Sequence, residues 1–164
     1  MRISGDVSFF CDEDEFSGVK KIAGKVCCDV ELVTGKKPEV EVISAVLNTT
    51  QEKIAGSNEA VFFATLDKSP LAERLAAEEG LSAELSKING KRECYIFAVK
   101  SNKIIILGSD KRGTIYGLFH ISELLGVSPL VDWAGVYLLT TSLLSLKRAL
   151  LLLKSLLYAS VAFL

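Results

Sequence analysis

Four consecutive acidic residues, Asp12, Glu13, Asp14 and Glu15, form the densest group of reactive side chains in the sequence. Neighbouring carboxyl groups can act as general acid and base, so the cluster is a candidate catalytic set. Asp12 and Glu15 also have the spacing of a capping box, and carboxylates are stabilised at the positive end of a helix dipole. Apolar residues at helical spacing follow, so we interpret the cluster as a capped, solvent-exposed helix start.

The turn from Gly108 to Gly113 is a candidate phosphate-binding loop, because glycines, Lys111 and Arg112 stand where a helix begins. Its spacing matches neither a Walker A motif nor G-x-G-x-x-G, and Asp110 would repel an anion. We therefore expect no cofactor here. Arg112 is interpreted as pairing with a carboxylate that fixes the helix.

Three further side chains are candidates for binding or catalysis. His120 is the only histidine, and no Ser or Cys nucleophile stands at a readable spacing from it, so we expect a structural or surface role. Tyr116 and Trp133 could stack on a sugar ring. Core packing is expected for Tyr116, whereas both interpretations stay open for Trp133.

The four cysteines, Cys11, Cys27, Cys28 and Cys94, form no C-x-x-C pair, and with one histidine they give too few spaced ligands for zinc. We expect reduced, mostly buried thiols, which suit a cytoplasmic protein. The N-terminus shows no signal-peptide pattern, which leads to the same expectation. No residue is assigned a catalytic, cofactor-binding or metal-binding role.

The chain of 164 residues has 19 basic and 20 acidic side chains, with a formal net charge of −1. This balance gives no attraction to nucleic acid, which we therefore exclude as a partner. The length is that of one domain.

Apolar patterns predict strands and helices that would position these groups. Strands are expected over residues 6–11, 39–47, 60–66, 94–100 and 103–108. Helices are expected from the acidic cluster to Gly35, from Ser69-Pro70 to Gly80, over 82–88, and from Ser109 or Asp110 to Leu125.

The order β-α-β-β-α-β-β-α predicts an α+β fold, with a mixed sheet of about five strands and packed helices. The first crossover should be parallel, and a tight turn at Ser101-Asn102 should make the last strand pair an antiparallel hairpin. Gly113 and Gly117 share one face of the final helix, where we expect close approach to the sheet.

The composition changes after Trp133. Leucine supplies 12 of the 30 residues in 135–164, and no acidic residue follows Asp132. Lys147, Arg148 and Lys154 interrupt the run, so no uncharged stretch reaches the roughly 18–20 residues of a membrane span. We interpret residues from about 135 onward as translated out of frame or otherwise truncated. Such a Leu-rich tail must either dock its leucines on the domain or promote self-association.

Residues 108–129, GSDKRGTIYGLFHISELLGVSP, resemble the segment that closes the N-terminal domain of glycoside hydrolase family 115, the xylan α-glucuronidases. Further matches to that family occur in the same order at residues 16–19, 33–38, 64–71, 90–93 and 133–134. The resemblance implies a hexosaminidase-like N-terminal domain over residues 1–134, which precedes a large catalytic barrel.

In that family the catalytic acids lie in the barrel, so the resemblance assigns no catalytic residue to this chain and implies that it is inactive alone. The implied function is to support hydrolysis of α-1,2-linked glucuronic acid side chains by the barrel, which is the expected partner and on which Arg112 would help to seat the domain. The alternative is a stand-alone binding or interaction module that uses the Leu-rich tail.

Overall fold

The computed structural model describes residues 7–44, 59–100 and 103–129. The strands within these residues are β1 (Ser8–Asp12), β2 (Val40–Ile43), β3 (Ala60–Thr65), β4 (Tyr95–Lys100) and β5 (Lys103–Gly108). The helices are α1 (Ser17–Thr34), α3 (Leu71–Glu78), α4 (Ser82–Ile88) and α5 (Lys111–Leu124).

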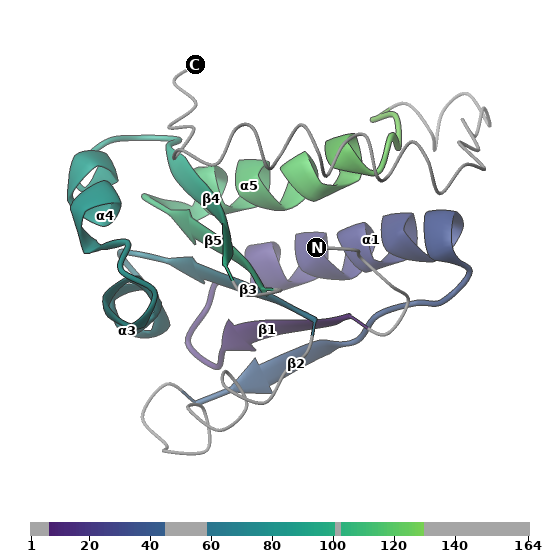
Figure 1. Cartoon of the computed structure of the whole chain (residues 1–164), viewed down its shortest axis with the longest axis horizontal. Helices are drawn as coiled ribbons and strands as arrows, with labels where there is room; N and C mark the ends of the chain where they lie inside the picture. The colour runs from purple at the N-terminus through teal and green to yellow at the C-terminus, as the bar shows by residue number, and fades with distance from the viewer. Residues whose placement is uncertain (1–6, 45–58, 101–102, 130–164) are drawn as a thin grey trace.

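The strands form one sheet in the order β2-β1-β3-β5-β4 (Figure 1). The first four of these run parallel, whereas β4 runs antiparallel to β5. Lys100 pairs with Lys103, so β4 and β5 form the predicted hairpin, although its turn residues lie outside the described ranges. The predicted α+β fold with a mixed five-stranded sheet is confirmed.

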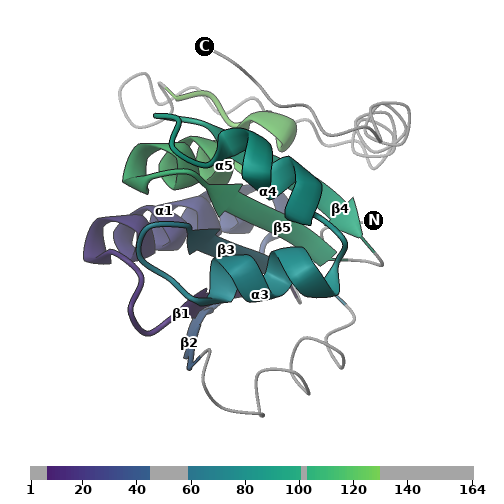
Figure 2. The same ribbon diagram turned by 90° about the vertical axis from the view of Figure 1, so that its left-hand side faces the viewer.

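Helices cover both faces of this sheet. α1 and α5 lie side by side on one face, and α3 and α4 lie on the other (Figures 1 and 2). Phe63 and Ile106 belong to the core under α1 and α5, whereas Phe62 and Ile105 belong to the core under α3 and α4. Because both faces are covered, the central strands consist almost entirely of apolar residues.

The two glycines of α5 allow the helix to approach the sheet edge closely, as predicted. A Cβ added at Gly113 would overlap the carbonyl oxygen of Cys94, and one added at Gly117 would overlap the side chain of Ile106. Larger residues would push the helix away from β4 and β5.

A buried hydrogen bond joins the two helices on this face. The Ser122 hydroxyl donates to Asp29 Oδ2 at 2.6 Å, and the two residues are 93 positions apart. Both side chains are buried, so removal of either one would leave the other without a hydrogen-bond partner. The bond therefore fixes α1 and α5 in one register.

The predicted helix ends are also present. Gly35 has φ 78° after α1, and Gly126 has φ 77° after α5, the left-handed conformation that glycine adopts without steric cost. Pro70 has helical dihedral angles, and the Ser69 hydroxyl accepts a hydrogen bond from the Leu71 N–H at 3.3 Å. Ser69 thus binds the first turn of α3 from the position before Pro70, which is itself the N-cap residue of the helix.

The acidic cluster does not cap α1, so that prediction is wrong. Asp12 is the last residue of β1, and α1 begins at Ser17 after Phe16, with no side-chain cap. Asp12 and Glu15 are only 1% and 4% exposed, while Glu13 and Asp14 face solvent. The capping box is a local pattern, and donors far along the chain bind these two carboxylates instead.

Cys11, Cys27 and Cys94 are buried and Cys28 is half-buried, so the expectation of mostly buried thiols is confirmed. Burial raises the pKa of Cys11 to about 11 and that of Cys27 to about 12. Within the described residues, no helix has both the length and the hydropathy to cross a membrane. Trp133 and the Leu-rich tail lie outside those residues.

Candidate functional site

Three parallel strands end with polar residues or glycine at one edge of the sheet. β1 ends at Asp12, β3 at Thr65 and β5 at Gly108. The chain leaves the adjacent strands β1 and β3 toward opposite faces, to α1 and α3. In open α/β sheets ligands bind at such a point, so we take this edge as the candidate site.

Five buried polar residues gather there, and we call them the carboxyl-edge cluster: Asp12, Glu15, Thr65, Ser69 and Thr114. Glu15 Oε2 accepts a hydrogen bond from the Thr65 N–H at 2.8 Å, and Oε1 accepts from the Thr65 hydroxyl at 2.9 Å. The N–H of Phe16 also donates to Oε1, at 2.9 Å. One carboxyl group therefore ties the segment before α1 to the end of β3.

The same cluster attaches α5 and α3. The hydroxyl oxygens of Thr65 and Thr114 lie 2.7 Å apart, which links β3 to the first turn of α5. The Ser69 hydroxyl donates to Asp12 Oδ2 at 2.9 Å, which links β1 to the start of α3. The cluster thus joins helices of both layers to the sheet.

Burial is the main influence on the Glu15 carboxyl. It raises the pKa of Glu15 above its ordinary value, while hydrogen bonds from Phe16 and Thr65 and the charge of Lys20 act in the opposite direction. A raised pKa in a crevice is typical of a general acid. Here both carboxyl oxygens are bound by donors of the chain itself, so the geometry is that of a structural joint.

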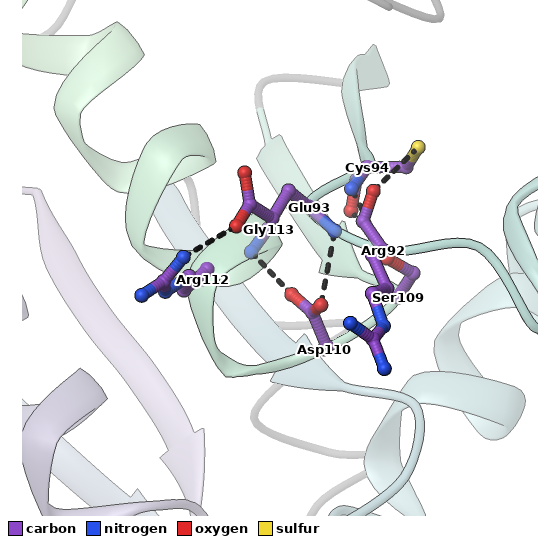
Figure 3. A network of polar contacts seen from close by, with 7 residues as sticks. All are labelled: Arg92, Glu93, Cys94, Ser109, Asp110, Arg112 and Gly113. Carbon is purple, nitrogen blue, oxygen red and sulfur yellow. Dashed lines mark hydrogen bonds and ion pairs between the residues drawn. The ribbon is translucent and has the colours of Figure 1, made fainter. Parts of the chain in front are cut away.

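A second polar network surrounds the first turn of α5 (Figure 3). Asp110 Oδ1 accepts a hydrogen bond from the Gly113 N–H at 2.7 Å, and Oδ2 accepts from the Glu93 N–H at 2.9 Å. Asp110 is therefore the N-cap of α5, one of the two residues predicted for that position. Its carboxylate occupies the place where a phosphate would bind in a glycine-rich loop.

Arg112 pairs with Glu93, with 2.6 Å between Nη1 and Oε1. This confirms the prediction that Arg112 binds a carboxylate. The Glu93 carboxylate raises the pKa of Arg112, chiefly through this hydrogen bond. Glu93 has φ 60°, an unusual conformation for a residue with a side chain, and its bonds to Asp110 and Arg112 hold it there.

Next to this network, main-chain and hydroxyl groups join β4 to the end of β5. The Ser109 N–H donates to the Cys94 carbonyl at 2.9 Å, and the Ser109 hydroxyl exchanges hydrogen bonds with the Cys94 main chain at 3.1 Å. This part of the edge is also satisfied by the chain's own groups.

His120 contacts β4 and not the carboxyl-edge cluster. His120 Nδ1 is 3.2 Å from the Tyr95 hydroxyl, and its ring packs on Phe97 with centroids 4.6 Å apart. Burial lowers the pKa of His120, so the ring is neutral near pH 7. Tyr116 is partly exposed and is not among the described core residues, so the expectation of core packing is wrong for it.

Sequence reasoning missed Thr65 and Thr114, and it assigned Asp12 and Glu15 to solvent. A usable signal existed: Thr65 is a hydroxyl residue within the apolar run that forms β3. Such a residue at the end of a buried strand needs a hydrogen-bond partner. Within the described residues, no group of three or more potential metal ligands comes together.

No known protein family matches the chain, and no curated protein sequence matches it. Among solved structures, it is similar to BtGH115A, described as a family GH115 4-O-methyl-α-glucuronidase with specificity for decorated arabinogalactans. The two share 26% sequence identity with a TM-score of 0.60, and the match covers 82% of this chain and 15% of that chain.

A second solved structure is that of a GH138 enzyme, described as targeting pectin rhamnogalacturonan II. It shares 14% identity at a TM-score of 0.38, over 79% of this chain and 14% of that chain. The described fold therefore corresponds to a small part of a glycoside hydrolase, about 15% of the length of BtGH115A.

Proposed function

We propose that residues 1–134 are the non-catalytic N-terminal domain of a glycoside hydrolase that resembles the family 115 α-glucuronidases. The likeness to BtGH115A over 82% of this chain and 15% of that chain carries the proposal. The motif at residues 108–129 supports it from the sequence. In this proposal a catalytic barrel outside the given sequence removes glucuronic acid side chains from xylan, and the domain packs on that barrel.

The bonding at the carboxyl edge supports a non-catalytic role. Asp12 and Glu15 are the buried carboxyl groups of this edge, and both accept hydrogen bonds from the chain. Glycoside hydrolysis generally needs two carboxyl groups that flank the scissile glycosidic bond, one of them free to give a proton to the leaving oxygen. Groups that hold helices to a sheet do not meet that requirement.

Incubation of the purified chain with aldouronic acids and with glucuronoxylan tests the proposal. We expect no release of glucuronic acid or its 4-O-methyl ether. Release that is abolished by Glu15→Gln would contradict the proposal and would make the carboxyl-edge cluster an active site.

The reading frames downstream of codon 164 give a second test. We propose that residues 135–164 are translated out of frame, so another frame should encode a barrel-like sequence that continues from Ala134. If no frame does, the out-of-frame interpretation fails and the Leu-rich tail is native.

A native tail would favour the alternative proposal, a stand-alone interaction module. Its support is the composition of residues 135–164, with 12 leucines and no acidic residue among 30. Deletion of these residues separates the two proposals. A fragment of a larger enzyme should gain solubility when the tail is removed, whereas a genuine interaction module should lose binding to its partner.

A further inference from the structure

The buried carboxyl of Glu15 faces two hydroxyl groups in a row. Its Oε1 is 2.9 Å from the Thr65 hydroxyl, which is 2.7 Å from the Thr114 hydroxyl. The Thr114 hydroxyl is in turn 3.2 Å from the carbonyl oxygen of Asp110, one helical turn earlier in α5. This series of atoms, the Glu15 relay, runs from the segment before α1 through β3 to α5.

When Glu15 is ionised, the hydroxyl protons point toward the carboxylate. The Thr65 hydroxyl donates to Oε1, and the Thr114 hydroxyl has one proton for two acceptors, the Thr65 oxygen and the Asp110 carbonyl. The Thr114 hydroxyl can therefore donate to only one of these two oxygens, and the other contact has no hydrogen bond.

When one proton from solvent is added to Oε1, the direction of the relay can reverse. Glu15 then donates to Thr65, Thr65 donates to Thr114, and Thr114 donates to the Asp110 carbonyl. The N–H groups of Phe16 and Thr65 still donate to the carboxyl oxygens. Every contact of the relay then carries a proton, with no movement of heavy atoms.

Charged and titratable groups from α1, β1 and α5 lie beside Glu15 or beside the other members of the relay. From α1, Lys20 favours the ionised form, and its Nζ donates to the Glu13 carbonyl at 2.7 Å. From β1, Asp12 is bound to Ser69, and the Cys11 thiol is neutral because burial raises its pKa to about 11. From α5, the Asp110 carboxylate is engaged by Gly113 and Glu93, and Lys111 lies against Gly18.

We propose that the Glu15 relay is proton-responsive: proton uptake by the buried carboxyl reverses the direction of the hydrogen-bond chain, so that it runs from Glu15 through Thr65 to Thr114 and ends on the Asp110 carbonyl at the start of α5. Burial raises the pKa of Glu15 in the folded chain above its ordinary value, although the hydrogen bonds from Phe16 and Thr65 act in the opposite direction. The folded state then holds the proton more tightly than the unfolded state. The stabilisation is fully present below the unfolded pKa and is lost as pH rises through the folded pKa.

Two isosteric substitutions should shift the pKa of Glu15 in opposite directions. Thr114→Val removes the acceptor that the protonated relay needs, so the pKa should fall. Thr65→Val removes a donor to the carboxylate, and a charge-assisted bond is stronger than a neutral one, so the pKa should rise. A side chain that only packs would give no such pair of opposite shifts.

The measurement is a carbon NMR titration of the Glu15 carboxyl in the full chain, with the resonance assigned through Glu15→Gln. Thr114→Ser keeps the hydroxyl and should restore the wild-type pKa. Thr34→Val is the matched control, because the Thr34 hydroxyl bonds at the far end of α1 and should leave Glu15 unchanged. An unchanged or raised pKa in Thr114→Val would overturn the proposal.

Stability gives an independent measurement if one variant folds poorly. The urea midpoint of the wild-type chain should fall as pH rises through the titration of Glu15, and Thr114→Ser should show the same fall. A wild-type midpoint that rises over this range would also overturn the proposal. Neither outcome bears on the proposed role as a non-catalytic domain.

Discussion

Two carboxylates fasten helices at the same edge of the sheet in opposite surroundings. Glu15 is 4% exposed and receives three hydrogen bonds from Phe16 and Thr65. Glu93 and Arg112 have side chains 40% and 71% exposed and meet in a single ion pair. When a buried acceptor is removed, its donors have no water to bind and stay unsatisfied. When an exposed ion pair is broken, water binds the group that remains. The ion pair of Arg112 with Glu93 should therefore contribute less to the free energy of unfolding than the hydrogen bonds to the Glu15 carboxylate.

The largest effect on this comparison should come from Glu15→Ala. It leaves two N–H groups and one hydroxyl without an acceptor in a buried site, so we expect a loss of about 3–5 kcal/mol in the free energy of unfolding. Urea denaturation measures it. Glu13→Ala is the control, since Glu13 is an exposed neighbour that binds the Ser44 hydroxyl. Equal losses in both variants would remove the distinction between buried and exposed carboxylates.

Gly113→Ala should have the next largest effect, because the added Cβ meets the Cys94 carbonyl, which is backbone and cannot rotate away. Overpacking of this kind costs about 1–3 kcal/mol. Gly24→Ala in α1 is the matched control, with nothing within 4 Å of its Cβ. It should instead raise stability, by about 0.5–1 kcal/mol, since alanine favours the helix. A stable Gly113→Ala variant would show that α5 is free to move outward.

Asp110→Ala should cost about 1–2 kcal/mol, which is the ordinary loss of an N-cap. The variant also removes the bond to Glu93, so the chain near residue 93 should be digested more readily at a neighbouring lysine or arginine. Asp110→Asn can still cap Gly113 and should lose less. If Asn and Ala variants unfold at the same urea concentration, the second bond to Glu93 carries the effect.

The smallest effect should come from Arg112→Ala, which we expect to leave the urea midpoint unchanged within error. Arg112 is the more exposed member of its pair, and such pairs contribute little because solvent screens them. If the urea midpoint of the wild-type chain is also insensitive to added salt, the exposed ion pair contributes little to stability, in contrast to Glu15. A clear loss of stability in this variant would contradict it.

The fold was predictable because its signals are local. The apolar runs of β3 and β5, the glycines Gly35 and Gly126 after helices, and the spacing of Gly113 and Gly117 each act within a few residues. The pairing of Arg112 with a carboxylate also followed from its place beside a helix start, although Glu93 itself was not identified.

The carboxyl-edge cluster was not predictable in the same way. Glu15 and Thr65 are 50 positions apart, and Asp12 and Ser69 are 57 apart, so their contacts depend on strand order, which the sequence pattern left open. The local pattern predicts that Asp12 and Glu15 cap a helix. Both carboxylates are buried instead, and a buried carboxylate needs hydrogen-bond donors, which Ser69 and Thr65 provide. Tyr116 was misplaced for the opposite reason: an aromatic residue in an apolar helix need not face the core.

The bond between Asp29 and Ser122 has a consequence for synthesis. The apolar side of α1 is completed by residues of α5, which leave the ribosome long after α1 does. At about 5–20 residues per second, a nascent chain would expose that side for several seconds. We therefore expect translation of α5 to be the step that commits the domain to its folded state, and chaperones that bind apolar segments to compete for the chain until then.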